Sequence, residues 1–375
     1  MFTSHYTPKF LTKNEIPMMR NYAKANEERG ALHPDILEVI HQKKWLRTTI
    51  PESISGGFEW SVPEIIALFE ELAYVDGNIG WTVNLGAGAN LFAGFFPEAV
   101  ANEIFSDPLV CCAGSGASTG TALYDEENEN YALKGYWRYA SGSDHATHFT
   151  GHAALMDTDG NEIKNRYGEL DTVTFLVPKS DVISHPSWRT LGLTATSSHD
   201  FEIKGATLPA AHTFDISKGS DFQTGALYHY PFPLFSTTAL SVMVSGITLH
   251  FIELFESEIL TKIPLYGEET LEHHANVRQD FERLVPQFFK LRSDFYAALE
   301  ASWGAVSKEK MILPQLENLL TDSALAMSDF CYDLATTLFR YCGMSILFEG
   351  SEFNQVYRDL MTATQHFVIS PINRN

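Results

Sequence analysis

Three side chains near the carboxyl end of the sequence have the types and spacing of a group that can handle protons. Asp359, Thr362 and His366 are separated by three and four residues, so a helix through this segment places them on one face. A helix presenting an acid, a hydroxyl and an imidazole is typical of a pocket wall. A surface helix whose histidine caps its end has the same pattern, and the sequence favours neither interpretation.

A second polar stretch, in the middle of the chain, has the composition of a ligand-facing strand. Residues 134–153 read KGYWRYASGSDHATHFTGHA. The small residues around Gly142 allow the backbone to lie close to a flat ligand, and Tyr139 supplies aromatic surface. The hydroxyl of Ser141 can donate or accept a hydrogen bond. This stretch is therefore a candidate binding strand.

Two glycine motifs give weaker signals. The segment from Gly114 to Gly120 formally matches a dinucleotide-binding loop and also a G-x-S-x-G nucleophile elbow, but both motifs need a helix to follow. The residues that follow, TALYDEENENYALKG, predict a hairpin instead. We interpret the segment as a strand end of small residues that a ligand can approach.

A group of histidines suggests a metal site. His145, His148 and His152 lie close together in the sequence, but residues three apart in a strand face opposite sides of a sheet. Solvated or supporting histidines are the better interpretation, and no metal is predicted.

The apolar pattern divides the chain into three parts that must position these residues. Residues 1–106 predict an N-terminal helical domain, in which Ser61 and Glu64 form a capping box. Residues 107–220 hold short runs rich in Val, Phe, Tyr and Thr between turn residues, which predicts a central antiparallel β-domain. Residues 221–375 predict a C-terminal four-helix bundle with one helix ended or kinked at Pro286. The fold class is α+β, mostly α.

Composition excludes several classes of protein. The 375 residues carry a formal net charge of −21, from 47 acidic and 26 basic side chains, so nucleic acid is a poor partner. The first residues lack the apolar core of a signal peptide, and no run approaches the roughly 20 apolar residues of a membrane helix. Four cysteines without C-x-x-C spacing suit reduced thiols. A cytoplasmic protein that binds no membrane is expected.

Four segments in a fixed order resemble one superfamily. They are Pro51 to Gly57 followed by Glu71 to Trp81, Gly135 to Ala146, Trp188 to Asp200, and Tyr357-Arg358-Asp359 followed by Gln365-His366. With these motifs the chain resembles the acyl-CoA dehydrogenase superfamily. It is more closely similar to the flavin-dependent monooxygenase branch, the oxygenase component of two-component hydroxylases. The likeness covers nearly the whole chain.

The resemblance implies an acyl-CoA dehydrogenase-like fold with a flavin, FMN or FAD, between the β-domain and the bundle. It also implies a homotetramer whose neighbouring subunits complete the flavin phosphate site. The residues implied in cofactor binding are Ser118, Thr119, Tyr139, Ser141, Gly142, Trp188, Thr196, Ser197, Ser198 and Lys262. Those implied in catalysis are His366, Ser141, Asp359 and Thr362.

One departure from the dehydrogenases bears on the reaction. Many of them carry a catalytic glutamate in an I-Y-E-G stretch after the Arg-Asp pair, where this chain reads Thr364-Gln365-His366-Phe367-Val368. Without that base, dehydrogenation of a thioester loses its first step. The resemblance therefore implies a monooxygenase that takes reduced flavin from a separate reductase. With O2, it would oxygenate a small aromatic or heteroatom-bearing substrate.

Two other functions stay open at this point. An acyl-CoA dehydrogenase or oxidase could carry its base elsewhere, at Glu256 or Glu349. A catalytically silent relative could serve as a binding module. The segment Tyr341 to Ser345 departs from the glycine-rich stretch that meets the adenosine half of FAD in dehydrogenases, which favours FMN.

Overall fold

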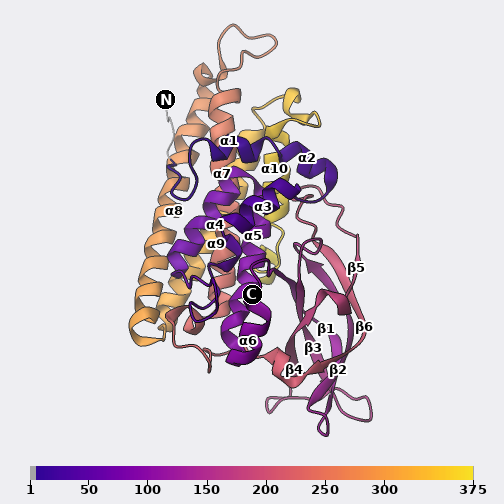
Figure 1. Cartoon of the computed structure of the whole chain (residues 1–375). Helices are drawn as coiled ribbons and strands as arrows, with labels where there is room; N and C mark the ends of the chain where they lie inside the picture. The colour runs from indigo at the N-terminus through magenta and orange to yellow at the C-terminus, as the bar shows by residue number, and fades with distance from the viewer. Residues whose placement is uncertain (1–5, 375) are drawn as a thin grey trace.

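Helices occupy both ends of the chain and the strands lie between them, as the sequence predicts. The computed structural model describes residues 6–374 (Figure 1). Residues 1–5 and 375, which belong to the predicted terminal domains and, at the start, to the segment without a signal-peptide core, lie outside the described part. In Figure 1 the long helices stand side by side, and the sheet covers one flank of the bundle.

The first part of the chain folds into helices, and side-chain caps fix the starts of the two longest of them. Ser61 and Glu64 form the predicted capping box, and both oxygens of the box are paired with backbone N–H groups. Asp76 caps the next helix by accepting from the N–H groups of Asn78 and Ile79. The helices are α1 (Glu15–Arg20), α2 (Ala23–Arg29), α3 (Pro34–Gln42), α4 (Val62–Val75), α5 (Gly77–Asn90) and α6 (Glu98–Phe105).

The middle of the chain forms one seven-stranded sheet in the order β5-β6-β2-β1-β3-β4-β7. The strands are β1 (Cys112–Asp125), β2 (Asn130–Ala140), β3 (His148–Met156), β4 (Thr172–Pro178), β5 (Ile183–His185), β6 (His199–Pro209) and β7 (Thr213–Phe214). Strands β1 and β3 run parallel, so the sheet is mixed, whereas the sequence predicted antiparallel pairing throughout. The whole Gly114–Gly120 segment lies within β1, and no helix follows it.

The sheet has an aromatic core of its own. The ring of Trp137 stacks on that of Phe201 with 5.1 Å between centroids, and it meets the ring of Phe175 edge-on at 5.2 Å. The indole N–H of Trp137 donates to the backbone oxygen of His152 at 2.8 Å. Burying such rings contributes roughly 2–3 kcal/mol each. These contacts hold β2, which carries Ser141 at its end, in a fixed place.

The last part of the chain forms the predicted bundle. Its helices are α7 (Phe232–Leu254), which continues as a π-helical turn (Phe255–Ile259), α8 (Ala275–Glu309), α9 (Pro314–Phe339) and α10 (Glu352–Ala363). Of the two outcomes predicted at Pro286, an end or a kink, the end does not occur, because helix α8 runs through this residue. Pro286 is exposed, so the carbonyl that it leaves without a partner can bond to water.

Helix α7 is the centre of the bundle. The segment 232–259 is long and apolar enough to cross a membrane by composition, contrary to the expectation that no such run exists. However, 94% of the 18-residue apolar stretch within this segment is buried inside the fold. It packs against α4, α5 and α9. Its hydrophobic side chains therefore serve as the core of the helical part of the molecule.

A buried carboxylate ties α4 to α7 and α8. Glu70, which is 1% exposed, accepts from the hydroxyl of Ser245 at 2.6 Å and from that of Tyr296 at 2.7 Å. The guanidinium of Arg292 donates to both of its oxygens, at 2.8 and 2.5 Å.

We predict that Glu70→Gln lowers the free energy of unfolding by roughly 3 kcal/mol, because it leaves the partly buried Arg292 without its counter-charge. Asp294→Asn, which breaks the exposed Lys290–Asp294 pair, is the matched control and should cost less than about 1 kcal/mol. Chemical denaturation of the three proteins measures both values. Equal losses in the two variants would contradict this account.

Candidate functional site

The loop from Trp188 to Ser198 holds the helical parts against the sheet. The N–H of Leu193 donates to Asp359 Oδ1 at 2.5 Å, and the N–H of Ala195 donates to Asn78 Oδ1 at 2.9 Å. Asn78 in turn donates to Asp359 Oδ2 at 3.0 Å. A carboxylate on α10 and an amide on α5 thus fix one loop of the β-domain.

The same loop needs a glycine at its closest approach to α10. A Cβ atom at Gly192 would lie 2.2 Å from the backbone carbonyl of Arg358. Only glycine allows this approach. The Arg358 side chain also donates to the backbone oxygen of Leu191 at 2.8 Å, so both members of the Arg-Asp pair hold the loop.

Ser141 lies at the end of a chain of hydroxyl groups that comes from this loop. Its Oγ is 2.7 Å from Ser198 Oγ, which is 2.7 Å from Thr196 Oγ1. Thr196 Oγ1 donates to the backbone oxygen of Leu193 at 2.8 Å. All three hydroxyl-bearing side chains are buried. The turn after Ser141 is joined to the loop as well, because the N–H of Gly142 donates to the Thr196 carbonyl at 2.8 Å.

Trp81 on α5 contacts both Ser141 and His366. Its indole N–H donates to Ser141 Oγ at 3.1 Å, and its ring lies 5.7 Å from the imidazole of His366, centroid to centroid. The sequence motif ending at Trp81 was noted without a role for this residue. A buried tryptophan needs a partner for its N–H, which is the signal that could have identified the contact.

His366 is held as a neutral imidazole. Its Nδ1 accepts from the N–H of Val368 at 3.3 Å, so the proton of the neutral ring is on Nε2. Burial lowers the pKa of His366 to about 4. Among residues 6–374 no partner bonds to Nε2, so this atom can donate a hydrogen bond to a ligand.

The prediction that Asp359, Thr362 and His366 share one helical face is only partly correct. Helix α10 ends at Ala363, and His366 lies in the turn beyond it. Asp359 points to the loop, and Thr362 donates back to the carbonyl of Arg358 at 2.9 Å. Neither is seen to contact His366. Burial, followed by the charge of Asp76, raises the pKa of Asp359 to about 8.

Two aromatic rings contact each other near the end of β2. Tyr139, two residues before it, is 54% exposed, and its ring meets that of Trp188 edge-on at 5.3 Å. The indole N–H of Trp188 donates to the backbone oxygen of Leu193 at 2.8 Å. Ser197 is fixed separately, by donating to Asp144 Oδ2 at 2.9 Å.

Three predicted cofactor-binding residues are not seen in contact with this group. Ser118 and Thr119 are exposed on β1, where pairing with β3 is irregular, and Thr119 donates to the carbonyl of Tyr136 at 2.6 Å. Lys262 bonds to Ser345 beyond the end of α7. Ile259, where the π-helical turn ends, is twelve residues beyond Ile247, the α7 residue that packs beside Gly77 near Asp359. Helical rise makes this separation about 18 Å.

The histidines singled out in the sequence do not converge. His145 lies in the turn before β3, and His152 pairs with Thr174 at 3.0 Å. Within the described range 6–374, no three His, Cys, Asp or Glu side chains are arranged to hold a metal ion. The four cysteines are free and buried.

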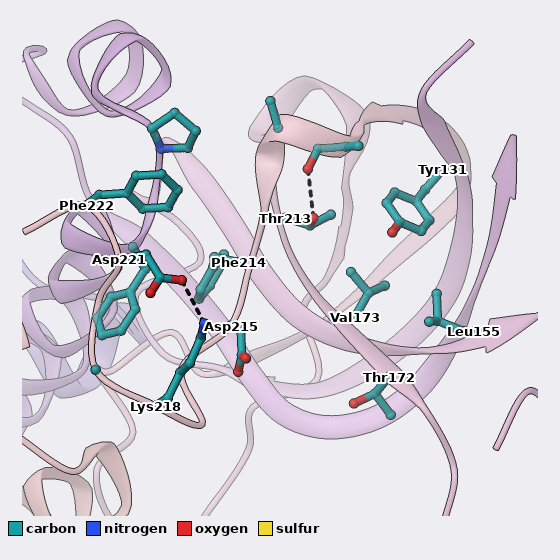
Figure 2. A pocket seen from close by; sticks show the side chains of 15 residues that line it. Tyr131, Leu155, Thr172, Val173, Thr213, Phe214, Asp215, Lys218, Asp221 and Phe222 are labelled. Atoms are coloured by element: carbon teal, nitrogen blue, oxygen red, sulfur yellow. Dashed lines mark hydrogen bonds and ion pairs between the residues drawn. The ribbon is translucent and has the colours of Figure 1, made fainter. Parts of the chain in front are cut away.

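A cavity of about 520 Å³ opens at the other end of the sheet and contains none of the predicted site residues. Figure 2 shows its lining, with Tyr131, Val173 and Phe214 on the sheet side and the ion pair of Lys218 with Asp221 on the loop. Tyr131, which lines the cavity, lies near the start of β2 (Asn130–Ala140), and Ser141 follows its end, so the cavity lies roughly 30 Å from Ser141.

Comparison with known proteins gives consistent relatives. No family model matches the chain. It is 22% identical to indole-3-acetate monooxygenase of Acinetobacter baumannii over 91% of this chain and 85% of that protein. It is 20% identical to the oxygenase component of p-hydroxyphenylacetate 3-hydroxylase of Acinetobacter baumannii, over 94% and 83%.

Solved structures give the fold. The HsaA monooxygenase of M. tuberculosis superposes with a TM-score of 0.84 at 18% identity, covering 96% of this chain and 93% of that one. XiaF from Streptomyces sp., solved with FADH2 and glycerol, also has a TM-score of 0.84, at 20% identity over 95% and 90%. KijD3, solved with FMN and a dTDP-amino sugar, has a TM-score of 0.76 at 14% identity, over 96% and 89%.

The chain is a relative of flavin-dependent monooxygenases with the acyl-CoA dehydrogenase fold. The predicted fold class is thereby confirmed. Within this fold, the described residues bring Ser141, Trp81 and His366 together with the Trp188–Ser198 loop.

We predict that Asp359→Ala frees the loop, because the N–H of Leu193 loses its acceptor. Hydrogen exchange at Leu193 should become at least about tenfold faster, and the free energy of unfolding should fall by roughly 1–3 kcal/mol. Asp333→Ala, on the exposed side of α9, is the control. Unchanged exchange at Leu193 would show that Asp359 does not hold the loop.

We also predict that His366 makes folding stability depend on pH. The unfolded chain binds a proton at His366 below about pH 6.5, whereas the folded chain does so only near pH 4. Stability from this group is therefore complete above pH 6.5 and is lost as the pH falls to 4. Urea denaturation across this range should show a shallower pH slope for His366→Gln than for the wild type. The same replacement at the exposed His274 should keep the wild-type slope.

Proposed function

We propose that this protein is the oxygenase component of a two-component flavin-dependent monooxygenase. It receives reduced flavin from a separate reductase and uses O2 to oxygenate a small aromatic or heteroatom-bearing substrate. The relatives named above act, by their names, on indole-3-acetate and p-hydroxyphenylacetate. The observation that carries the proposal is that Trp81 joins His366 to Ser141, through a ring contact with the first and a hydrogen bond to the second. In the sequence, His366 stands in the stretch where many dehydrogenases carry their catalytic glutamate.

The residues at this position fit a flavin ring. Tyr139, two residues before Ser141, offers exposed aromatic surface and contacts Trp188. Among the described residues, only Trp81 and Ser198 are seen to bond to Ser141 Oγ, which leaves it one lone pair for a ligand. Ser141, Tyr139 and Trp188 would hold the ring, which when reduced supplies the electrons that activate O2. The role of this chain is to bind the ring, exclude water from it and place hydrogen-bond donors.

His366 then acts as a donor. With its proton on Nε2 and a pKa near 4, the imidazole is uncharged at neutral pH and offers a hydrogen bond to the substrate or to an oxygen atom near the ring. Trp81 fixes its distance from Ser141 through the ring contact. Asp359, in this view, supports the site by holding the loop, and Thr362 supports the end of α10.

The dehydrogenase alternative has less support. Glu256 lies in the π-helical turn after α7, where burial raises its pKa to about 7, and Glu349 is exposed in the loop before α10. Neither is seen to contact Ser141, Trp81 or His366. Asp359 is near the site, but both of its oxygens already accept hydrogen bonds.

The proposal includes assembly of four copies of this protein into a homotetramer. The segment around Lys262 exposes large apolar side chains, with Leu265 87% and Tyr266 97% exposed, and Phe348 lies exposed in the neighbouring loop. We infer that this surface packs on a second copy and brings Lys262 to the phosphate of that copy's flavin. One cation suits the single phosphate of FMN better than the longer FAD. Buried, free cysteines support a cytoplasmic location.

We predict that dithionite-reduced FMN, O2 and a panel of phenols and indoles give an oxygenated product with the wild type. His366→Ala should lower the rate of product formation by roughly 10²-fold while FMN still binds, because only the donor is removed. His274→Ala is the control. Product detection by mass spectrometry, with hydrogen peroxide measured alongside, separates coupled from wasted turnover.

Two results would favour the other functions. Loss of flavin colour on adding an acyl-CoA without a reductase would indicate a dehydrogenase. Failure to bind either FMN or FAD at micromolar concentration, measured by fluorescence quenching, would indicate a silent binding module.

A further inference from the structure

The hydroxyl groups of Thr196, Ser198 and Ser141 form a chain of hydrogen bonds in which each group donates in one direction. At one end the indole N–H of Trp81 can only donate, and it donates to Ser141 Oγ. At the other end the backbone oxygen of Leu193 can only accept, and Thr196 donates to it at 2.8 Å. Between them lie the contacts of Ser141 with Ser198 and of Ser198 with Thr196, each 2.7 Å long.

Counting protons fixes the direction, because each hydroxyl has a single proton to donate. When Thr196 donates to Leu193, Ser198 must donate to Thr196 and Ser141 must donate to Ser198. This order makes four hydrogen bonds and leaves Ser141 with one free lone pair and no free proton. In the opposite order Thr196 donates to Ser198, Ser198 donates to Ser141, and the bond to Leu193 is lost.

The surroundings of the three hydroxyls oppose a reversal of their hydrogen bonds. Thr196, Ser198 and Trp81 are 1%, 1% and 7% exposed, so a hydroxyl that loses its partner here is buried. Leu193 is held by Asp359, and its carbonyl also accepts from Trp188. Reversing the chain therefore costs about one neutral hydrogen bond, a factor of about five in an equilibrium constant.

We propose that this directed chain makes Ser141 an acceptor and thereby selects reduced over oxidised flavin. The inference rests on the proposed function and adds that Ser141 Oγ meets N5, the ring nitrogen that gains a proton when flavin is reduced. Reduced flavin carries an N–H at N5 and can donate to Ser141 without disturbing the chain. Oxidised flavin has a bare nitrogen there, so it gains a hydrogen bond only if the chain reverses. Thr196 and Ser198 are thus specificity-determining residues that need not touch the flavin.

Two replacements test the chain from different positions. Thr196→Val removes the donor to Leu193 while keeping the shape of the side chain, and Ser198→Ala frees the proton of Ser141. Each should lower the ratio of the dissociation constants of oxidised and reduced FMN by about fivefold. The midpoint potential of bound FMN should then fall by about 20 mV, which is the same factor for a two-electron couple.

Each variant has a matched control. Thr48 is fully buried and its hydroxyl donates three residues back, to Trp45, as that of Thr196 does to Leu193. Ser143 is buried in the turn next to Ser141, and its hydroxyl donates to the backbone of Ala140 outside the chain. Thr48→Val and Ser143→Ala should keep the wild-type ratio of dissociation constants.

The measurement is an anaerobic titration of each folded protein with oxidised FMN and with dithionite-reduced FMN. A ratio that falls in Thr196→Val and in Ser198→Ala, and in neither control, supports the proposal. A ratio in both variants equal to that of the wild type overturns it while leaving the proposed function intact. Absence of binding of either form to the wild type overturns the proposed function as well. If one variant fails to fold, the other decides alone.

Discussion

The peptide of Leu193 is the contact on which the rest of the site depends. Its N–H bonds to Asp359 on α10, and its oxygen accepts from Trp188 and Thr196 of the β-domain loop. Leu193 has a positive φ of 51°, which a branched side chain rarely adopts, so the surrounding hydrogen bonds must hold it there. Because one residue joins α10 to both ends of the loop, displacement of α10 would also displace the hydroxyl chain behind Ser141.

The site is uncharged although the chain as a whole is strongly acidic. The whole chain has a net charge of −21, whereas the groups gathered around Ser141 are an imidazole, an indole and a row of hydroxyls. Burial explains part of this, since it lowers the pKa of His366 and raises that of Asp359. Uncharged hydrogen-bond donors and acceptors in fixed orientations can distinguish two forms of a ligand that carry protons on different atoms. A flavin changes its protons with its redox state, so such a site can read that state without a charged side chain.

The sequence predicted the larger elements because their signals are local. The capping box at Ser61, the apolar stripes of the long helices and the small residues of β1 each depend on neighbours within a few positions. Local rules were less informative where solvent or a turn decided the outcome. At Pro286 the sequence predicts an end or a kink, and α8 does not end there, since this side of the helix is exposed. His366 left the helical face because α10 ends three residues earlier.

What the sequence determined by itself is the set of chemical groups and the order of the three parts. The hydroxyls of Ser141, Thr196 and Ser198, the imidazole at 366 and the absence of a glutamate beside it are fixed by residue type. Only the tertiary structure decided that Trp81 contacts both Ser141 and His366. It also decided that Asp359 bonds to the loop at Leu193 and not to His366. These contacts join residues 60 to 285 positions apart, and no local pattern records which distant donors and acceptors will meet.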